Sequence, residues 1–206
     1  MIKIIGNHKV QHGDITNGID QLMLNEKADF IYTDPPWGQG NISYWQTINK
    51  KMTGQKRNEI EYSSFIDNFF SILDKFSYDR VIVEYGQKWH NDIIEMSNKH
   101  NFIHNGSCKS LYVSGNKKFP LDMHFLSKKS SVKITQDIKD DCYSLSGFKI
   151  VSKLFDHYCP TNAQIVLDPM CGMGYTAQAT IDRNMSFRGN ELNIKRLEKT
   201  ITRLEK

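Results

Sequence analysis

The residues with the most specific chemistry stand in one short run, Asp34-Pro35-Pro36-Trp37. Proline fixes φ and has no backbone N–H, so two successive prolines hold the chain rigidly. The Asp34 carboxylate and the Pro35 carbonyl then become fixed acceptors, a pair that suits an exocyclic amine, and Trp37 offers a flat face for the ring that carries the amine. We interpret the run as a site that holds an NH2 group with its nitrogen lone pair directed at an electrophile. A bare turn is the weaker alternative, because an exposed Trp in a Pro-Pro turn has little structural use.

A second group of residues follows a predicted strand at 164–168. Gly172 and Gly174 let the backbone approach a ligand closely, and the helix start behind them suits a polar or anionic group. Asp168 at the strand end can accept a hydrogen bond from a ligand amine or hydroxyl. Glu191 stands 23 residues further on, at the end of the next predicted strand, where an acid commonly binds ribose hydroxyls. The flanking acids favour a nucleoside-containing cofactor over a plain glycine turn.

The elements that must position these residues alternate along the chain, which is typical of a mostly parallel sheet covered on both faces. Two polar stretches, 38–60 and 128–144, are expected to be loops, and 110–113 with 123–127 an antiparallel hairpin. Hydrophobic patterning predicts strands near 10–12, 29–33, 80–86, 164–168 and 187–191, and helices near 19–25, 62–76, 91–100, 148–158 and 176–183 and at the C-terminus.

Length and composition limit the classes of protein. With 206 residues and 39% hydrophobic residues, one globular domain is expected. The chain has no apolar run long enough to span a membrane and no secretory start, so a cytoplasmic protein is expected. Four separated cysteines without a C-x-x-C pair predict free thiols, and the seven histidines show no ligand spacing, so no metal site is expected.

The net charge of +4 permits a polyanionic partner without demanding one. Basic residues gather in two places, and both could contact phosphates. A solvated lysine surface explains the same charges equally well. The candidate nucleic-acid contacts are Lys50, Lys51, Lys56 and Arg57 in the first patch and Lys117 and Lys118 in the second.

Together these motifs resemble the S-adenosylmethionine-dependent amino-methyltransferases of DNA and RNA, whose catalytic motif is (D/N/S)-P-P-(Y/F/W). The order, with the catalytic motif first and the cofactor loop near the C-terminus, is similar to the permuted β-class. The spelling DPPW is also that of the RNA N6-adenosine enzymes. The family's cofactor loop, D-P-F-x-G-S-G-T-T, matches residues 168–176 except at Met170, Met173 and Tyr175.

The resemblance implies an α/β protein with the Rossmann-like class I methyltransferase fold, in one circularly permuted domain. Family members that read a specific sequence generally carry an added target-recognition region, whereas here only 38–60 and about 128–145 are long enough to contribute, so we expect no separate target-recognition domain. It implies a mostly parallel sheet with an antiparallel hairpin and helices on both faces. Glu191 would bind the cofactor ribose and Asp14 the adenine amino group. The implied catalytic residues are Asp34, Pro35, Pro36 and Trp37, and the implied S-adenosylmethionine-binding residues are Asp14, Lys149, Asp168, Pro169, Cys171, Gly172, Gly174 and Glu191.

The activity implied is direct in-line methyl transfer to adenine N6 in DNA, on a flipped-out or single-stranded nucleotide. Cytosine N4, RNA adenine N6 and a catalytically silent nucleic-acid-binding subunit of a heteromeric methyltransferase stay open as alternatives. A nicotinamide-dependent oxidoreductase would share the glycine loop but has no use for Asp34-Pro35-Pro36-Trp37. Because only short segments are left for target recognition, we expect recognition by loops, by a partner subunit or second copy, or a single-stranded or structured substrate.

Overall fold

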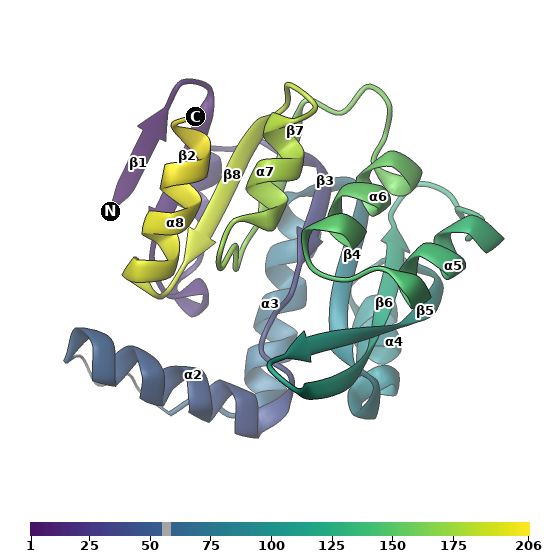
Figure 1. Cartoon of the computed structure of the whole chain (residues 1–206), viewed down its shortest axis with the longest axis horizontal. Coiled ribbons are helices and arrows are strands. Elements are labelled where there is room, and N and C mark those ends of the chain that lie inside the picture. The colour runs from purple at the N-terminus through teal and green to yellow at the C-terminus, as the bar shows by residue number, and fades with distance from the viewer. Residues whose placement is uncertain (55–58) are drawn as a thin grey trace.

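The computed structural model describes residues 1–54 and 59–206, and its strands form one eight-stranded sheet in the order β1-β2-β8-β7-β3-β4-β6-β5 (Figure 1). The five central strands run parallel, and each edge ends in an antiparallel hairpin. The strands are β1 (Ile2–Ile5), β2 (His8–His12), β3 (Ala28–Thr33), β4 (Ser77–Gly86), β5 (Ile103–Ser114), β6 (Lys117–Ser127), β7 (Ile165–Asp168) and β8 (Ser186–Glu191).

Helices cover both faces of the sheet, as expected (Figure 1). One hydrophobic cluster packs α1, α3 and α4 on one face, and two others pack α5, α6, α7 and α8 on the opposite face. No helix among the described residues combines the length and the apolar character that crossing a bilayer requires. The helices are η1 (Ile15–Asn17), α1 (Asp20–Met23), α2 (Gly38–Thr53), α3 (Tyr62–Phe76), η2 (Gln87–Trp89), α4 (His90–Lys99), α5 (Gln136–Ser144), α6 (Phe148–Tyr158), α7 (Tyr175–Ile181) and α8 (Ile194–Leu204).

Helix α3 shows how the sequence produces this packing. Phe65, Ile66, Phe69, Phe70 and Leu73 recur at three- and four-residue spacing, so they share one side of the helix, and all are buried. Burying a side chain of this size contributes about 1.5–3 kcal/mol relative to leaving it exposed. The helix ends at the extended Ser77, where β4 begins.

The central strands bring the chemical residues to one edge of the sheet. Strand β3 is buried on both faces and pairs in parallel with β7 on one side and β4 on the other. Parallel strands end at the same edge, so Asp34 after β3, Asp168 at the end of β7 and Glu191 at the end of β8 emerge together. The sheet thus collects residues that are far apart in the chain.

The expectation of a loop over 38–60 is wrong for most of that range, because residues 38–53 form α2. Two glycines and a polar composition obscured the helical signal. Ile42, Trp45 and Asn49 recur at helical spacing, and Ile42 and Asn49 are buried. The helix ends at Gly54, which has φ +73, a conformation that glycine adopts without strain.

The polar stretch 128–144 is likewise not all loop, because it ends in α5. Thr135 caps this helix by accepting a hydrogen bond from the Ile138 amide, and Ile138 and Cys142 are buried one turn apart. At the N-terminus, β1 was not predicted; it pairs with β2 across a turn at Gly6. The β5–β6 hairpin is longer than predicted and extends well beyond the body of the sheet (Figure 1).

Candidate active site

A cavity of about 610 Å³ lies at the carboxyl ends of the central strands. Its walls come from both ends of the chain and from the middle of it, because the strand order interleaves these segments. The sequence-predicted residues that line it are Asp14, Asp34, Pro35, Pro36, Trp37, Asp168, Cys171, Gly172 and Glu191. The two motifs that are separated by more than a hundred residues therefore share one cavity.

Asp14 and Glu191 meet because the first and last parallel strands are neighbours. His12 of β2 is in register with Glu191 of β8, and the Gly13 amide donates to the Glu191 carbonyl over 3.1 Å. Oδ1 of Asp14 accepts hydrogen bonds from the amide and the hydroxyl of Thr16, at 3.1 and 2.9 Å, and so caps η1. The side chain is thereby fixed at the cavity wall.

The glycine loop after β7 is tied to Glu191. Its two carboxylate oxygens accept hydrogen bonds from the Gly172 amide at 2.8 Å and the Asn193 amide at 2.7 Å. Gly172 has φ +50, which a residue with a Cβ adopts only with strain. One acid thus orders the loop after β7 and the start of α8 together, and both border the cavity.

Asp168 is held in the same loop by two donors. Its carboxylate accepts hydrogen bonds from the Thr176 hydroxyl at 2.6 Å and the Met170 amide at 3.1 Å. Burial raises the pKa of Asp168 to about 7, although both hydrogen bonds oppose the rise. The neutral acid is therefore well populated near physiological pH, and the group can act as a donor or as an acceptor toward a ligand.

Pro169 and Gly174 support the loop from behind rather than lining the cavity. The Pro169 carbonyl accepts a hydrogen bond from the Asn190 side chain at 3.1 Å. Gly174 has φ +81, and a Cβ there would lie 2.8 Å from the Thr200 hydroxyl of α8. The second glycine is thus required for the close approach of the loop to α8.

The Asp34–Trp37 segment is braced by two tyrosines. The Tyr85 hydroxyl donates to the Pro36 carbonyl at 2.9 Å, while the Trp37 indole nitrogen donates to Oδ1 of Asp34 at 3.1 Å. The Tyr112 ring meets Trp37 edge to face, with centroids 6.3 Å apart. Although water reaches Asp34 from the cavity, desolvation by the surrounding protein raises its pKa to about 6, against the lowering effect of the Trp37 hydrogen bond.

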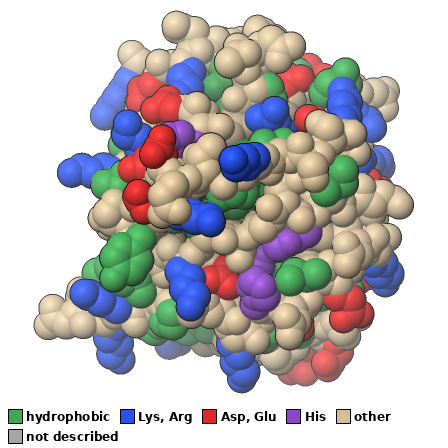
Figure 2. Space-filling model, turned by 90° about the vertical axis from the view of Figure 1, so that its right-hand side faces the viewer, with side chains coloured by type: hydrophobic (Ala, Val, Ile, Leu, Met, Phe, Trp, Pro, Cys, Tyr) green, Lys and Arg blue, Asp and Glu red, His purple; other side chains and the backbone are tan. Residues whose placement is uncertain are grey.

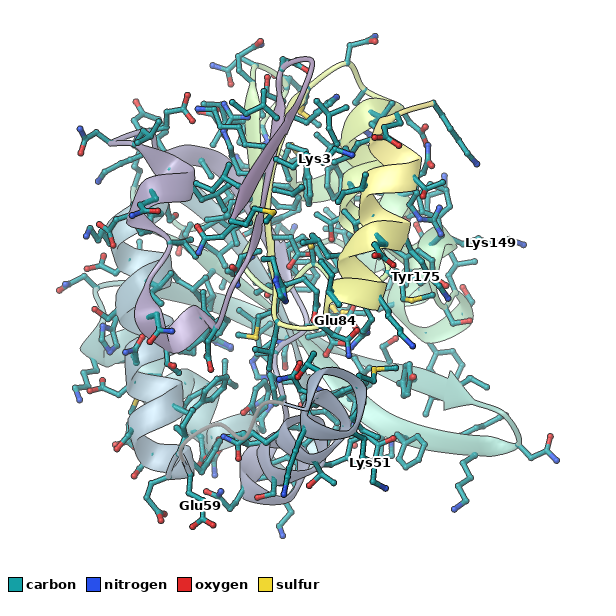
Figure 3. All side chains as sticks on the ribbon, turned by 90° about the vertical axis from the view of Figure 1, so that its left-hand side faces the viewer. Lys3, Lys51, Glu59, Glu84, Lys149 and Tyr175 are labelled. Atoms are coloured by element: carbon teal, nitrogen blue, oxygen red, sulfur yellow. The ribbon has the colours of Figure 1, made fainter. Side chains whose placement is uncertain are left out.

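Glu84 is a cavity residue that sequence reasoning missed. It projects from β4 toward Asp34 and is hydrogen-bonded by the Tyr32 hydroxyl; Figure 3 shows it in the interior, between α8 and α2. Burial raises its pKa to about 8, and the negative charge of Asp34 adds to the rise. The available signal was an acid inside an otherwise apolar strand, Val81 to Tyr85.

Three polar side chains along the cavity wall have atoms without hydrogen-bond partners among the described residues, and sequence reasoning missed these residues too. Asn49 of α2, Ser110 of β5 and Asn190 of β8 are buried, and each has at least one side-chain polar atom that makes no hydrogen bond within the described residues. Burying an unsatisfied polar group is unfavourable by about 1–3 kcal/mol. A bound polar ligand would satisfy such atoms, and all three residues face the cavity.

Solved structures share this architecture. M1.HpyAVI in complex with S-adenosylmethionine superimposes with a TM-score of 0.66 at 16% identity, covering 95% of this chain and 98% of that one. The TTHA0409 protein of Thermus thermophilus superimposes with a TM-score of 0.66 at 17% identity, covering 96% of this chain and 94% of that one. The PvuII DNA methyltransferase (cytosine-N4-specific) superimposes with a TM-score of 0.66 at 11% identity, covering 96% of this chain and 86% of that one.

The fold is the Rossmann-like class I methyltransferase fold. This confirms the fold predicted from the sequence. At these identities the likeness concerns the fold alone, and neither a protein-family model nor a curated protein matches the sequence.

Within this methyltransferase fold, the predicted basic contacts lie on the surface. Lys50 and Lys51 are exposed in the last turn of α2, and Lys117 and Lys118 are exposed at the tip of the β5–β6 hairpin. Figure 1 shows α2 and the hairpin tip extending on the same side of the molecule. Lys56 and Arg57 lie outside the described residues.

Lys149 is not brought to the cavity. It stands in the first turn of α6 and points into solvent (Figure 3). The same segment instead presents Ser146, Gly147 and Ile150 to the cavity. In this class I methyltransferase fold, a ligand at the start of α6 would therefore meet a small polar residue and backbone, not the lysine amine.

Proposed function

We propose that the chain is an S-adenosylmethionine-dependent methyltransferase that methylates the exocyclic amine of a nucleobase, adenine N6 in DNA, by direct in-line transfer, with both motifs in one circularly permuted domain. The observation that carries the proposal is the shared cavity, which is lined both by the acceptor residues Asp34 and Pro35 and by Gly172 of the glycine loop and Glu191 at the end of β8. Such a transfer needs a site for the NH2 group that receives the methyl group and a site for the nucleoside part of the cofactor within one cavity.

The residues present fit S-adenosylmethionine. Cavities of about 300–1,000 Å³ suit ligands of that size, and this one measures about 610 Å³. Asp14 and Glu191 provide carboxylates for an adenine amino group and ribose hydroxyls. Unpartnered atoms on Asn49 and Asn190 add polar contacts. When bound, S-adenosylmethionine supplies the methyl group as an electrophile.

The residues of the chain then hold the acceptor. The Asp34 carboxylate and the Pro35 carbonyl accept hydrogen bonds from the NH2 group and so orient its lone pair. The indole of Trp37 stacks on the base, while its ring nitrogen keeps Asp34 in place. Tyr112 and the half-exposed Phe119, both on the hairpin, extend the aromatic wall beside Trp37.

Nucleic acid is the acceptor class that the surface favours. A base that reaches Asp34 must leave its stack, and the exposed lysines on α2 and on the hairpin tip are the residues that we propose contact the flanking phosphates. DNA is proposed ahead of RNA. Cytosine N4 is the second candidate, because the PvuII enzyme, which has the same fold, is described as cytosine-N4-specific.

The test is to incubate the purified chain with methyl-labelled S-adenosylmethionine and either DNA or RNA, digest the nucleic acid and identify the labelled nucleoside. We expect labelled N6-methyl-2′-deoxyadenosine from DNA. The Asp34→Asn variant should retain cofactor binding by calorimetry and lose at least about 100-fold in rate. Cofactor binding without any labelled nucleoside would contradict the methyltransferase proposal. Labelled N4-methylcytosine would show that the acceptor is cytosine N4, the second candidate, and not adenine N6.

A further inference from the structure

Three of the seven histidines, which are scattered in the sequence, come together on the sheet face opposite the cavity wall formed by β6. His90 begins α4, His104 lies in β5 and His124 in β6. Their ring centroids are 5.0–6.4 Å apart. Figure 2 shows histidine side chains side by side on this side of the molecule, next to acidic ones.

Asp122 completes the group. Oδ2 of Asp122 lies 2.6 Å from Nδ1 of His90, and Asp122 and His124 are two residues apart on one face of β6. One ligand atom from each of His90, Asp122 and His124 lies within 4.8 Å of the other two. Small side-chain shifts would bring three such atoms to the roughly 2.0–2.2 Å at which Zn²⁺ binds histidine nitrogen and carboxylate oxygen.

His124 is the independent sign that a ligand belongs here. The residue is fully buried, and its Nε2 atom makes no hydrogen bond within the described part of the chain. Its other nitrogen, Nδ1, lies 3.0 Å from Nε2 of His104. If Nδ1 donates in that bond, the lone pair on Nε2 is free. Metal-bound histidines are oriented in the same way, by a hydrogen bond from the nitrogen that does not touch the ion.

The surroundings also suit a metal ion. The ring of His124 lies beside those of His90 and His104, with centroids 5.0 and 5.3 Å away. Asp122 is buried and offers the negative charge. The side chain of His90 is 36% exposed, so an ion can enter from solvent beside it.

From this geometry we infer that His90, Asp122 and His124 form a binding site for a divalent transition-metal ion such as Zn²⁺, with His104 positioning His124. Two imidazoles and one carboxylate form a donor set of the kind that such ions prefer. The fourth position is left for water at the exposed side.

The site would have a structural role. Leu121 and Met123 line the cavity, whereas Asp122 and His124 alternate to the other face of β6. An ion held there joins the start of α4 to the base of the β5–β6 hairpin and does not touch the methyl-transfer residues. Because the ion binds only the folded chain, it should raise the melting temperature.

The test is to titrate the full chain, prepared without a histidine tag and stripped by a chelator, with Zn²⁺ in a calorimeter and with Co²⁺ in a visible spectrometer. We expect one equivalent to bind with a dissociation constant in the micromolar range or below, Co²⁺ absorption bands of a nitrogen- and oxygen-ligated ion, and a higher melting temperature with Zn²⁺. His90→Ala should weaken Zn²⁺ binding at least about 10-fold, as should His104→Asn, which acts through His124.

His157→Ala is the matched control, because His157 forms a similar pair with Asp141 at 2.8 Å but no third ligand is found beside it among the described residues. This variant should bind Zn²⁺ like the wild type. His90 is half-exposed, so its alanine variant should fold, which the circular dichroism of the metal-free protein checks. Absence of one-equivalent binding, or equal affinities of His90→Ala and His157→Ala, would overturn the inference. Methylation is not a readout, so the outcome is independent of the proposed function.

Discussion

The indole nitrogen of Trp37 donates a hydrogen bond to Oδ1 of Asp34 over 3.1 Å. The donor stabilises the charged carboxylate, whereas desolvation by the surrounding protein favours the neutral acid, and the balance leaves the pKa of Asp34 at about 6. Trp37 is thus more than a stacking surface. It keeps its neighbour ionised and aimed into the cavity.

Replacing Trp37 by Phe should therefore move the pH dependence of activity. Asp34 acts as an acceptor only when it is ionised, so kcat/KM of the wild type should fall as the pH drops through about 6. Phe retains a stacking ring but donates no hydrogen bond, so the pKa of Asp34 rises. The acidic limb should shift upward by about one pH unit. The measurement is kcat/KM from pH 5 to 9 for both proteins.

The matched control is Tyr112→Phe. Its ring keeps the edge-to-face contact with Trp37, and within the described residues it is the Trp37 indole that donates to Asp34, not the Tyr112 hydroxyl. Its acidic limb should coincide with that of the wild type. An unshifted limb in Trp37→Phe would show that the Trp37 hydrogen bond does not tune Asp34.

Glu84→Gln should stabilise the protein in alkaline solution. The folded-state pKa of Glu84, about 8, is raised above its ordinary value of 4.5. Folding therefore favours the protonated acid, and the stability present below the unfolded-state pKa is lost as the pH rises through about 8. Gln is a neutral isostere and avoids this loss. At pH 9 the variant should melt several degrees higher, given roughly 2–4 °C per kcal/mol, and at pH 5 at nearly the same temperature.

Glu95→Gln on the exposed side of α4 serves as the control, since this change removes an acid from the surface. Its melting temperature should follow that of the wild type at both pH values. Equal curves for Glu84→Gln and the wild type at pH 9 would mean that the charge on Glu84 is well solvated in the cavity.

Gly174→Ala should loosen α8 from the cofactor loop. Gly174 and Gly115 both have positive φ, but only at Gly174 would a Cβ meet neighbours, the Thr200 hydroxyl at 2.8 Å and the Thr200 Cα at 3.0 Å. Gly115→Ala should lower the free energy of unfolding by about 1 kcal/mol, from backbone strain alone. Gly174→Ala should lower it by more, about 2–4 kcal/mol, and weaken cofactor binding. Urea unfolding and calorimetry measure both; equal losses would argue against the contact with Thr200.

Reversing the charges of Lys117 and Lys118 should weaken nucleic-acid binding without changing cofactor affinity. Each phosphate contact contributes about 0.9 to the slope of log affinity against log salt for duplex DNA, so the double Glu variant should reduce that slope by up to about 2. The assay is DNA binding at several salt concentrations. Lys27→Glu, before the amino end of β3 and away from the cavity, is the control. Unchanged binding by the double variant would leave the hairpin lysines as an ordinary solvated surface.

Much of the fold could be predicted, because strongly periodic segments determine their own structure. The apolar spacing of α3 and the apolar runs of β3 and β4 were recognised within a few residues. Helix α2 was not, because its apolar residues are diluted by polar ones: Ile42 joins the hydrophobic cluster around α3, whereas Trp45 and Asn49 border the cavity. Residues that bury only part of a face leave a weak pattern.

The candidate site divides in the same way. Asp34 and Asp168 were found because each stands at a strand end directly before a proline, and Glu191 because it ends the next predicted strand, 23 residues after Asp168. Glu84 was missed because a lone acid in a strand has meaning only once its neighbours are known. Lys149 was placed at the cofactor by resemblance, and the helix turns it outward.

By itself, the sequence determined most of the strands and helices, although not β1, α2 or α5, and the local geometry of the two motifs, since proline, glycine and hydrophobic periodicity act over a few residues. Only the tertiary structure decided which distant residues meet. Strand order placed Asp14 beside Glu191, and the pairing of β5 with β6, with the start of α4 alongside, gathered His90, His104 and His124. Such contacts depend on how the chain closes long loops, which no local pattern records.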